Sequence, residues 1–166
     1  KNPRYSARCA VLHPRSRGYV GLRSSDPADK PRILWNLFKD PYDLATLREG
    51  IKAIRDIFKQ SPLRELGPSE FTPGPGTEDD ANLEEWLRAN CQTAQHPAGT
   101  CRMGAADDEM AVVDGELRVR GTRSLRVVDA SVMPTLVRGN INAAVVMIAE
   151  KAADLIAGHD VLAPRG

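Results

Sequence analysis

The sequence has few cysteines, no long apolar run and almost no net charge, and each of these absences excludes a class of protein. Its 166 residues include three cysteines, an odd and sparse count that does not make a disulfide framework. The longest apolar run, Ala143 to Ala149, is far shorter than the roughly 20 residues that span a bilayer. The net charge of +1 creates no field that would favour nucleic acid. We therefore expect a cytoplasmic protein with no transmembrane segment and no nucleic-acid partner; a peripheral association with the inner membrane is left open.

Two further patterns are missing. The chain has no GxGxxG dinucleotide fingerprint, because Gly74-Pro75-Gly76 lacks both a third glycine and a preceding strand. It begins with Lys1, with no signal-peptide pattern after it. We expect the chain to be a piece of a longer protein.

What the sequence does contain is a mixture of short strands and amphipathic helices. Residues 19–22 favour a strand, and residues 33–38 favour either a strand or a buried lead-in to the next helix. That helix is predicted to follow Asp40, because an aspartate can cap it and Pro41 suits its first position. Its apolar stripe has helical spacing and consists of Leu44, Leu47, Ile51, Ile54 and Phe58.

The later part of the chain is predicted to alternate in the same way. Thr77 and Asp80 resemble a capping box that would start a second helix. The last helix is predicted from Asn140 to about Ala157. We expect an α+β fold with a mainly antiparallel sheet and flanking helices. Its further strands are predicted at 92–104, in two short pieces within 105–124, and at 125–128.

His96 is the first candidate for chemistry. Its neighbours Pro97, Ala98 and Gly99 are small, and an imidazole accepts a proton near neutral pH. The alternative is a hydrogen-bonded core histidine. A metal site with Cys91 and Cys101 is disfavoured, because residues five apart on a strand point to opposite faces and no fourth ligand is near.

Two other segments carry polar groups where a ligand could bind. Asp129-Ala130-Ser131 follows an apolar strand, a place where ligand contacts and simple turns are about equally common. Asn140-Ile141-Asn142 opens the last helix, whose first-turn N–H groups carry partial positive charge. That charge suits an anionic group such as the pyrimidine edge of a reduced flavin. A plain asparagine N-cap is the alternative, and both roles can coexist.

The motifs HPAGTCRMG, VVDGELRVRGTRSLRVVDASVMP and GNINAAVVMIAEKAADLI occur in this order. Together with HPRSRGYVGLRSSDPADKP near the start, they resemble the C-terminal part of the glucose-methanol-choline (GMC) oxidoreductases, in particular the choline and alcohol dehydrogenases among them. The resemblance implies an FAD enzyme that oxidises a primary alcohol to an aldehyde.

The same resemblance assigns roles to residues. It implies that His96 is the catalytic base and that Asn140 is the second residue of the catalytic pair. It places residues 1–104 in the substrate-binding part and residues 105–166 in the FAD-binding part. The residues that it implies lie along the flavin are Asp129, Ala130, Asn140, Ile141 and Asn142.

A missing N-terminal FAD-binding segment of the same protein is the partner that this resemblance implies. Without it, residues 127–133 and the last helix are expected to leave an apolar side uncovered, a surface that favours pairing, including a homodimer. The chain alone is expected to be inactive.

Two alternatives stay open at this point. One is a binding or regulatory module of the same architecture without chemistry. The other is a hydrolase that pairs His96 with Ser131 or Cys101, although the sequence has no GxSxG elbow.

Overall fold

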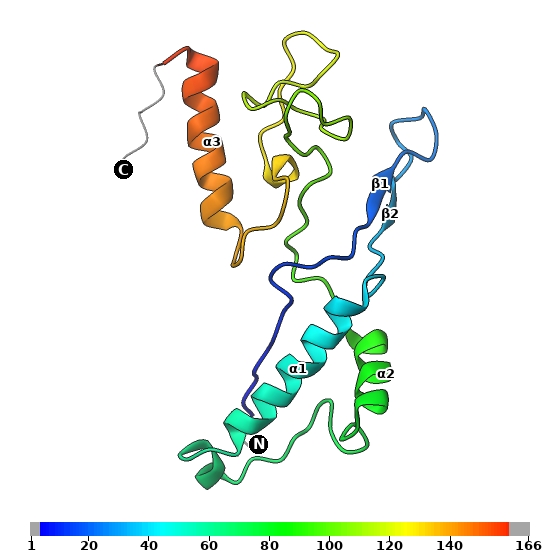
Figure 1. The fold of residues 1–166 in the computed structure, drawn as a ribbon, viewed down its shortest axis with the longest axis vertical. Coiled ribbons are helices and arrows are strands. Elements are labelled where there is room, and N and C mark those ends of the chain that lie inside the picture. The colour runs from blue at the N-terminus through cyan, green and yellow to red at the C-terminus, as the bar shows by residue number, and fades with distance from the viewer. Residues whose placement is uncertain (1–3, 160–166) are drawn as a thin grey trace. The chain divides into compact units, whose positions relative to one another are not determined.

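The computed structural model describes residues 4–159 and divides the chain into two compact units, Lys1–Ala94 and Gln95–Gly166. Figure 1 shows the elements of both units. The predicted boundary between a substrate-binding part (residues 1–104) and an FAD-binding part (residues 105–166) is a division by function, and it stays a prediction. None of the helices within residues 4–159 is long and apolar enough to cross a membrane.

The first unit contains an antiparallel hairpin of β1 (Tyr19–Gly21) and β2 (Arg32–Leu34), in which Val20 pairs with Ile33. The predicted strand at 19–22 is confirmed. For residues 33–38 the strand alternative holds as far as Leu34, and the alternative of a buried lead-in was wrong, since Trp35 and Leu37 are each 47% exposed. The strand ends at Leu34, and a turn with left-handed backbone follows and leads into the next helix.

Helix α1 (Pro41–Phe58) begins as predicted. The Asp40 carboxylate accepts a hydrogen bond of 2.9 Å from the backbone N–H of Tyr42, and Pro41 occupies the first turn. A short 3-10 turn, η1 (Leu63–Leu66), follows α1.

Helix α2 (Asp80–Asn90) does not begin as predicted. Its cap is Asp79, whose carboxylate accepts from the N–H of Asn82 at 2.9 Å, so the expected Thr77 capping box was wrong. Thr77 is buried one turn earlier, where its hydroxyl donates to Gly74 O and accepts from Arg55.

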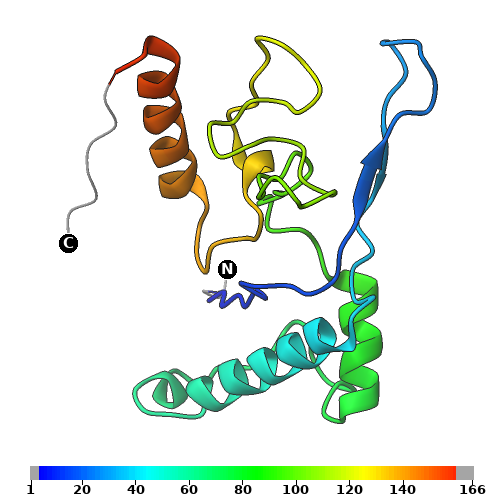
Figure 2. The ribbon, with the colours of Figure 1, turned by 45° about the horizontal axis from the view of Figure 1, so that its top comes forward.

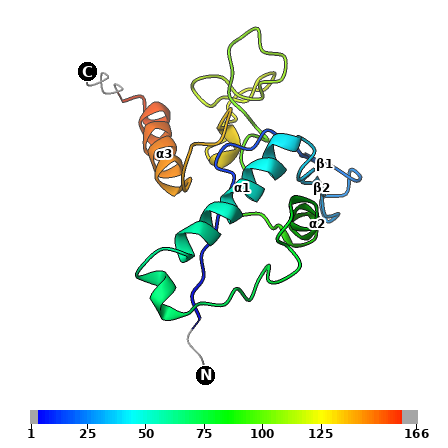
Figure 3. The same cartoon turned by 60° about the horizontal axis from the view of Figure 1, so that its bottom comes forward.

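The two helices share an apolar core. Figures 2 and 3 show α2 against the N-terminal half of α1. Beside this core the Arg48 guanidinium binds the Glu84 carboxylate at 2.7 Å, in a half-buried pair that links the two helices. Of the predicted α1 stripe, Leu44 and Leu47 are fully buried and the rest is half-buried. The first core consists of Leu44, Leu47, Leu83 and Leu87.

Asp43 of α1 binds the backbone of the segment that precedes the hairpin. The side chain is 4% exposed, and its two oxygens accept from the N–H groups of Arg15 and Ser16, each at 2.8 Å. Burial would raise the pKa of this carboxyl. The hydrogen bonds from Ser16 and Arg15, with the charge of Arg17, outweigh burial and hold the pKa below its ordinary value.

Asp43→Asn is expected to lower the free energy of unfolding of the first unit by about 2 kcal/mol at pH 7, because hydrogen bonds to a charged group are lost. The folded-state pKa is lowered, so the carboxylate stabilises the fold above about pH 4, and this contribution is lost as the pH falls through the lowered pKa. The gap between variant and wild type in urea unfolding should therefore narrow in acid. Asp56→Asn, at an exposed position, is the control. An equal gap at pH 7 and in acid would contradict this account.

The second unit has one long helix, α3 (Asn142–Ala157), and one short turn, η2 (Ala130–Val132). The strands predicted between residues 92 and 128 were wrong, because within residues 4–159 this region has only isolated pairs such as Met103–Val113 and Arg118–Arg126. Turns interrupt the backbone too often for a ladder to extend. The α+β class is confirmed, with the antiparallel β1–β2 hairpin as the sheet of the described residues.

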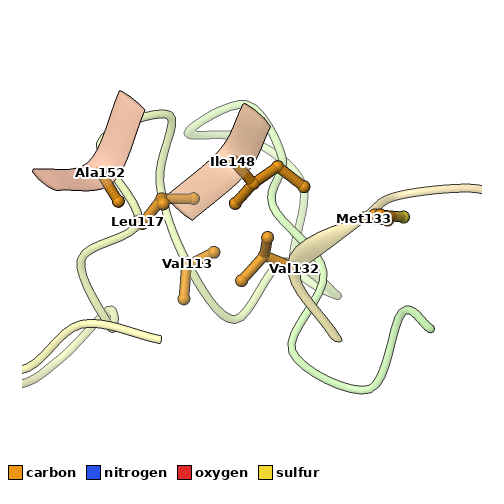
Figure 4. Close-up of a cluster of buried hydrophobic side chains, with 6 residues drawn as sticks. All are labelled: Val113, Leu117, Val132, Met133, Ile148 and Ala152. Atoms are coloured by element: carbon orange, nitrogen blue, oxygen red, sulfur yellow. The ribbon is translucent and has the colours of Figure 1, made fainter. Parts of the chain in front are cut away.

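Side chains from α3, η2 and the loop at 113–117 form the core of this unit, and Figure 4 shows Ile148 and Ala152 of α3 facing the others. The outer side of α3 exposes Val146, Met147 and Ile156 by 51%, 57% and 61%, so the uncovered apolar side predicted for this helix is confirmed. For residues 127–133 that prediction was wrong, since every apolar residue of this segment is buried or half-buried. The second core consists of Val113, Leu117, Val132, Met133, Ile148 and Ala152.

Candidate active site

The three segments that carry the candidate residues meet on the second core. Ala98 lies two residues after His96, Ala130 follows Asp129, and Ile141 follows Asn140. All three apolar side chains pack, half-buried, against this core. The structure therefore brings together segments that are distant in the sequence: His96 and Asn140 are more than 40 residues apart.

Backbone contacts place the His96 segment beside η2. The N–H of Cys101 donates to Ser131 O at 3.0 Å, and that of Met103 donates to Val132 O at 2.8 Å. Gly99 has φ +85°, and a Cβ built on it would lie 3.3 Å from Met133 O. Residues 99–103 thus run along residues 131–133, and a Cβ at Gly99 would fit only if Met133 O moved by a few tenths of an ångström.

His96 itself is half-buried and makes no hydrogen bond or ion pair among residues 4–159. The alternative of a hydrogen-bonded core histidine was therefore wrong. A partly exposed imidazole with a free ring nitrogen can accept a proton from a bound molecule.

Asp129 has a structural partner in addition to any ligand. Its carboxylate accepts from the N–H of Ser131 at 2.7 Å and caps η2. The turn interpretation of this triplet is confirmed. The residue is exposed, so its second oxygen remains accessible.

The start of α3 lacks a side-chain cap. Its N-cap is Ile141, and neither Asn140 nor Asn142 makes a side-chain hydrogen bond within residues 4–159, so the asparagine-cap alternative was wrong. The first-turn N–H groups therefore carry their partial positive charge without a side-chain acceptor. Two exposed amide side chains flank that charge.

The cysteines do not complete a metal site. Cys91 belongs to the first unit, where it packs against the first core, and burial raises the pKa of its thiol. A raised pKa disfavours the thiolate that binds metals. Among residues 4–159 no group of three His, Cys, Asp or Glu side chains is arranged to hold a metal ion.

Comparison with known proteins agrees with these features. The family model of the GMC oxidoreductases matches residues 14–149. The chain belongs to the GMC oxidoreductase family. It is 45% identical over 160 residues to oxygen-dependent choline dehydrogenase 1 of Chromohalobacter salexigens, covering 96% of this chain and 29% of that relative. It is 47% identical to oxygen-dependent choline dehydrogenase of Escherichia coli, covering 89% of this chain and 26% of the relative.

Solved structures of family members show the same fold. Pyridoxine 4-oxidase from Mesorbium loti has a TM-score of 0.79 at 35% identity, over 90% of this chain and 29% of that one. An FAD-dependent oxidoreductase from Chaetomium thermophilum has a TM-score of 0.82 at 33% identity, over 89% of this chain and 25% of that one. The chain thus spans less than a third of the length of the relatives that it matches.

Gly99→Ala is expected to destabilise the second unit by at least about 1 kcal/mol, because alanine disfavours positive φ and its Cβ would press on Met133 O. The measurement is the midpoint of urea unfolding. Gly115→Ala is a matched control, since no atom lies within 4 Å of a Cβ there and its φ is not positive. Equal midpoints for the two variants would show that the approach of residue 99 to residue 133 is not tight.

Proposed function

We propose that the protein containing this chain is an FAD-dependent oxidoreductase that converts a primary alcohol to an aldehyde, with His96 as base. The observation that carries this proposal is the joint anchoring on one core of a segment with an unbonded imidazole and a helix start without a cap. Membership of the GMC family supports it. Choline is the first substrate to test, because relatives at 45% and 47% identity are named choline dehydrogenases.

The residues present fit FAD. The uncapped first turn of α3 offers N–H groups and positive charge to the anionic edge of a reduced flavin. When bound, FAD supplies the acceptor for the hydride of the alcohol. The residues that would hold it are Asp129, Ala130, Asn140, Ile141 and Asn142.

In this proposal the protein's own groups act on the alcohol oxygen. A neutral ring nitrogen of His96 accepts the hydroxyl proton, which makes the carbinol carbon a better hydride donor. The Asn140 amide donates a hydrogen bond to the same oxygen and orients the substrate. Neither side chain has a partner among the described residues that would compete for these roles.

The rest of the protein is proposed to cover the exposed apolar side of α3, where Val146, Met147 and Ile156 face outward. A homodimer, a cytoplasmic location and a peripheral attachment to the inner membrane stay predictions.

A His96→Ala variant of the full-length enzyme is expected to lose about 10²- to 10⁴-fold in kcat with choline, because it removes a positioned base. FAD content, read from the absorbance of the purified protein, should remain. His13→Ala, an exposed position in the first unit, is the control. Unchanged turnover in the His96 variant would remove the base from this mechanism.

Asn140→Ala is expected to lower kcat/KM about tenfold, the equivalent of one hydrogen bond in the transition state. Since the Asn140 side chain is exposed and unbonded, its loss should leave the unfolding midpoint unchanged. Steady-state kinetics check the loss in kcat/KM, and urea unfolding of the same preparation checks the unchanged midpoint. A variant that lost stability and kept its activity would show a structural role instead.

A further inference from the structure

We propose that Arg120 is a positioning residue for His96 and acts through the backbone of residues 98–105. This inference rests on the proposed function where it concerns catalysis. Arg120 lies in the loop before η2, in a stretch that contains several arginines.

Within residues 4–159, the Arg120 guanidinium donates hydrogen bonds to main-chain carbonyls alone. One nitrogen donates to Asp108 O at 2.9 Å, and the other donates to Gly104 O at 2.8 Å and Ala105 O at 2.5 Å. Among residues 4–159 it has no carboxylate partner. Its planar fork holds three carbonyls at fixed angles, which an ammonium cannot reproduce.

These carbonyls lie at the end of the stretch that carries His96. The backbone of Arg120 is tied in as well, since its N–H donates to Val112 O at 3.0 Å while the N–H of Val112 donates to Arg102 O at 2.9 Å. The Arg102 side chain also binds the Asp108 carboxylate at 2.8 Å. Arg120 therefore closes a loop of bonds around residues 102–112.

From there the restraint continues toward His96. Residues 101 and 103 are hydrogen-bonded to residues 131 and 132, Gly99 lies against Met133 O, and Ala98 packs on the second core. These contacts restrain the backbone at intervals from Ala98 to Gly104, the first carbonyl that Arg120 binds. Loss of Arg120 would leave Gly104 O without its donor and would remove one of the two donors from Ala105 O and Asp108 O, which loosens the far end of this restraint.

The arginines nearby behave differently. Arg118 is exposed and pairs with Asp114 and Glu116, as a surface residue does. Arg123 is exposed and has no partner among residues 4–159. Arg123→Gln therefore removes the same charge from the same loop without touching the carbonyls, and it is the matched control.

The test uses the full-length enzyme as Arg120→Gln, Arg120→Lys and Arg123→Gln. Kinetics with choline are expected to show kcat lower by about 10- to 100-fold in Arg120→Gln at equal FAD content, with a smaller change in KM, because the base is displaced. Arg120→Lys should fall between this variant and the wild type and serves if Arg120→Gln does not fold. Arg123→Gln should match the wild type.

A second measurement does not depend on catalysis. Diethylpyrocarbonate labels accessible imidazoles, and peptide mass spectrometry gives the rate at each histidine. His96 should be labelled several-fold faster in Arg120→Gln, with His13 unchanged and Arg123→Gln like the wild type. If kcat and His96 labelling are unchanged while thermal stability falls, Arg120 is structural only and the inference is overturned. If labelling changes while His96→Ala remains active, positioning stands and the assigned base is wrong.

Discussion

The hydrogen bonds from the N–H groups of Cys101 and Met103 to the carbonyls of Ser131 and Val132 are the constraint on which the second unit depends. They join two irregular stretches that have no sheet of their own to hold them. Because Val132 is at the same time a fully buried core residue, the bonds also fix the His96 stretch relative to α3, which packs on that core. Packing density then makes the arrangement resistant to small displacements.

Polar groups at the candidate site differ in how they are held. One oxygen of the Asp129 carboxylate accepts a hydrogen bond from the N–H of Ser131 in the same turn, so local structure sets the position of this carboxylate. His96, Asn140 and Asn142 have no such restraint from their side chains and rely on backbone and on apolar neighbours. A site built in this way leaves its reactive groups free for a ligand, at the expense of about 1 kcal/mol that a helix cap would have contributed.

The sequence predicted best the elements whose signals are local. The start of α1 follows from Asp40 and Pro41, because a cap depends on a few adjacent residues. Thr77 failed as a cap because Asp79 lies closer to the helix and Arg55, from another element, takes up the hydroxyl. The strand expected at 92–104 failed for a similar reason: its N–H groups bind a turn, and strand propensity does not reveal the partner. Motifs identified His96 and Asn140, but only the structure places their segments on one core.

Each of the two units has its own set of buried side chains, Leu83 in one and Val113 and Val132 in the other. Cooperative melting follows from a shared interior, so two interiors supply two cooperative blocks. A single transition temperature is then an average over events of different origin. In calorimetry of this polypeptide, each heat-absorption step has to be assigned to one of the two units before the effects of substitutions on stability are compared.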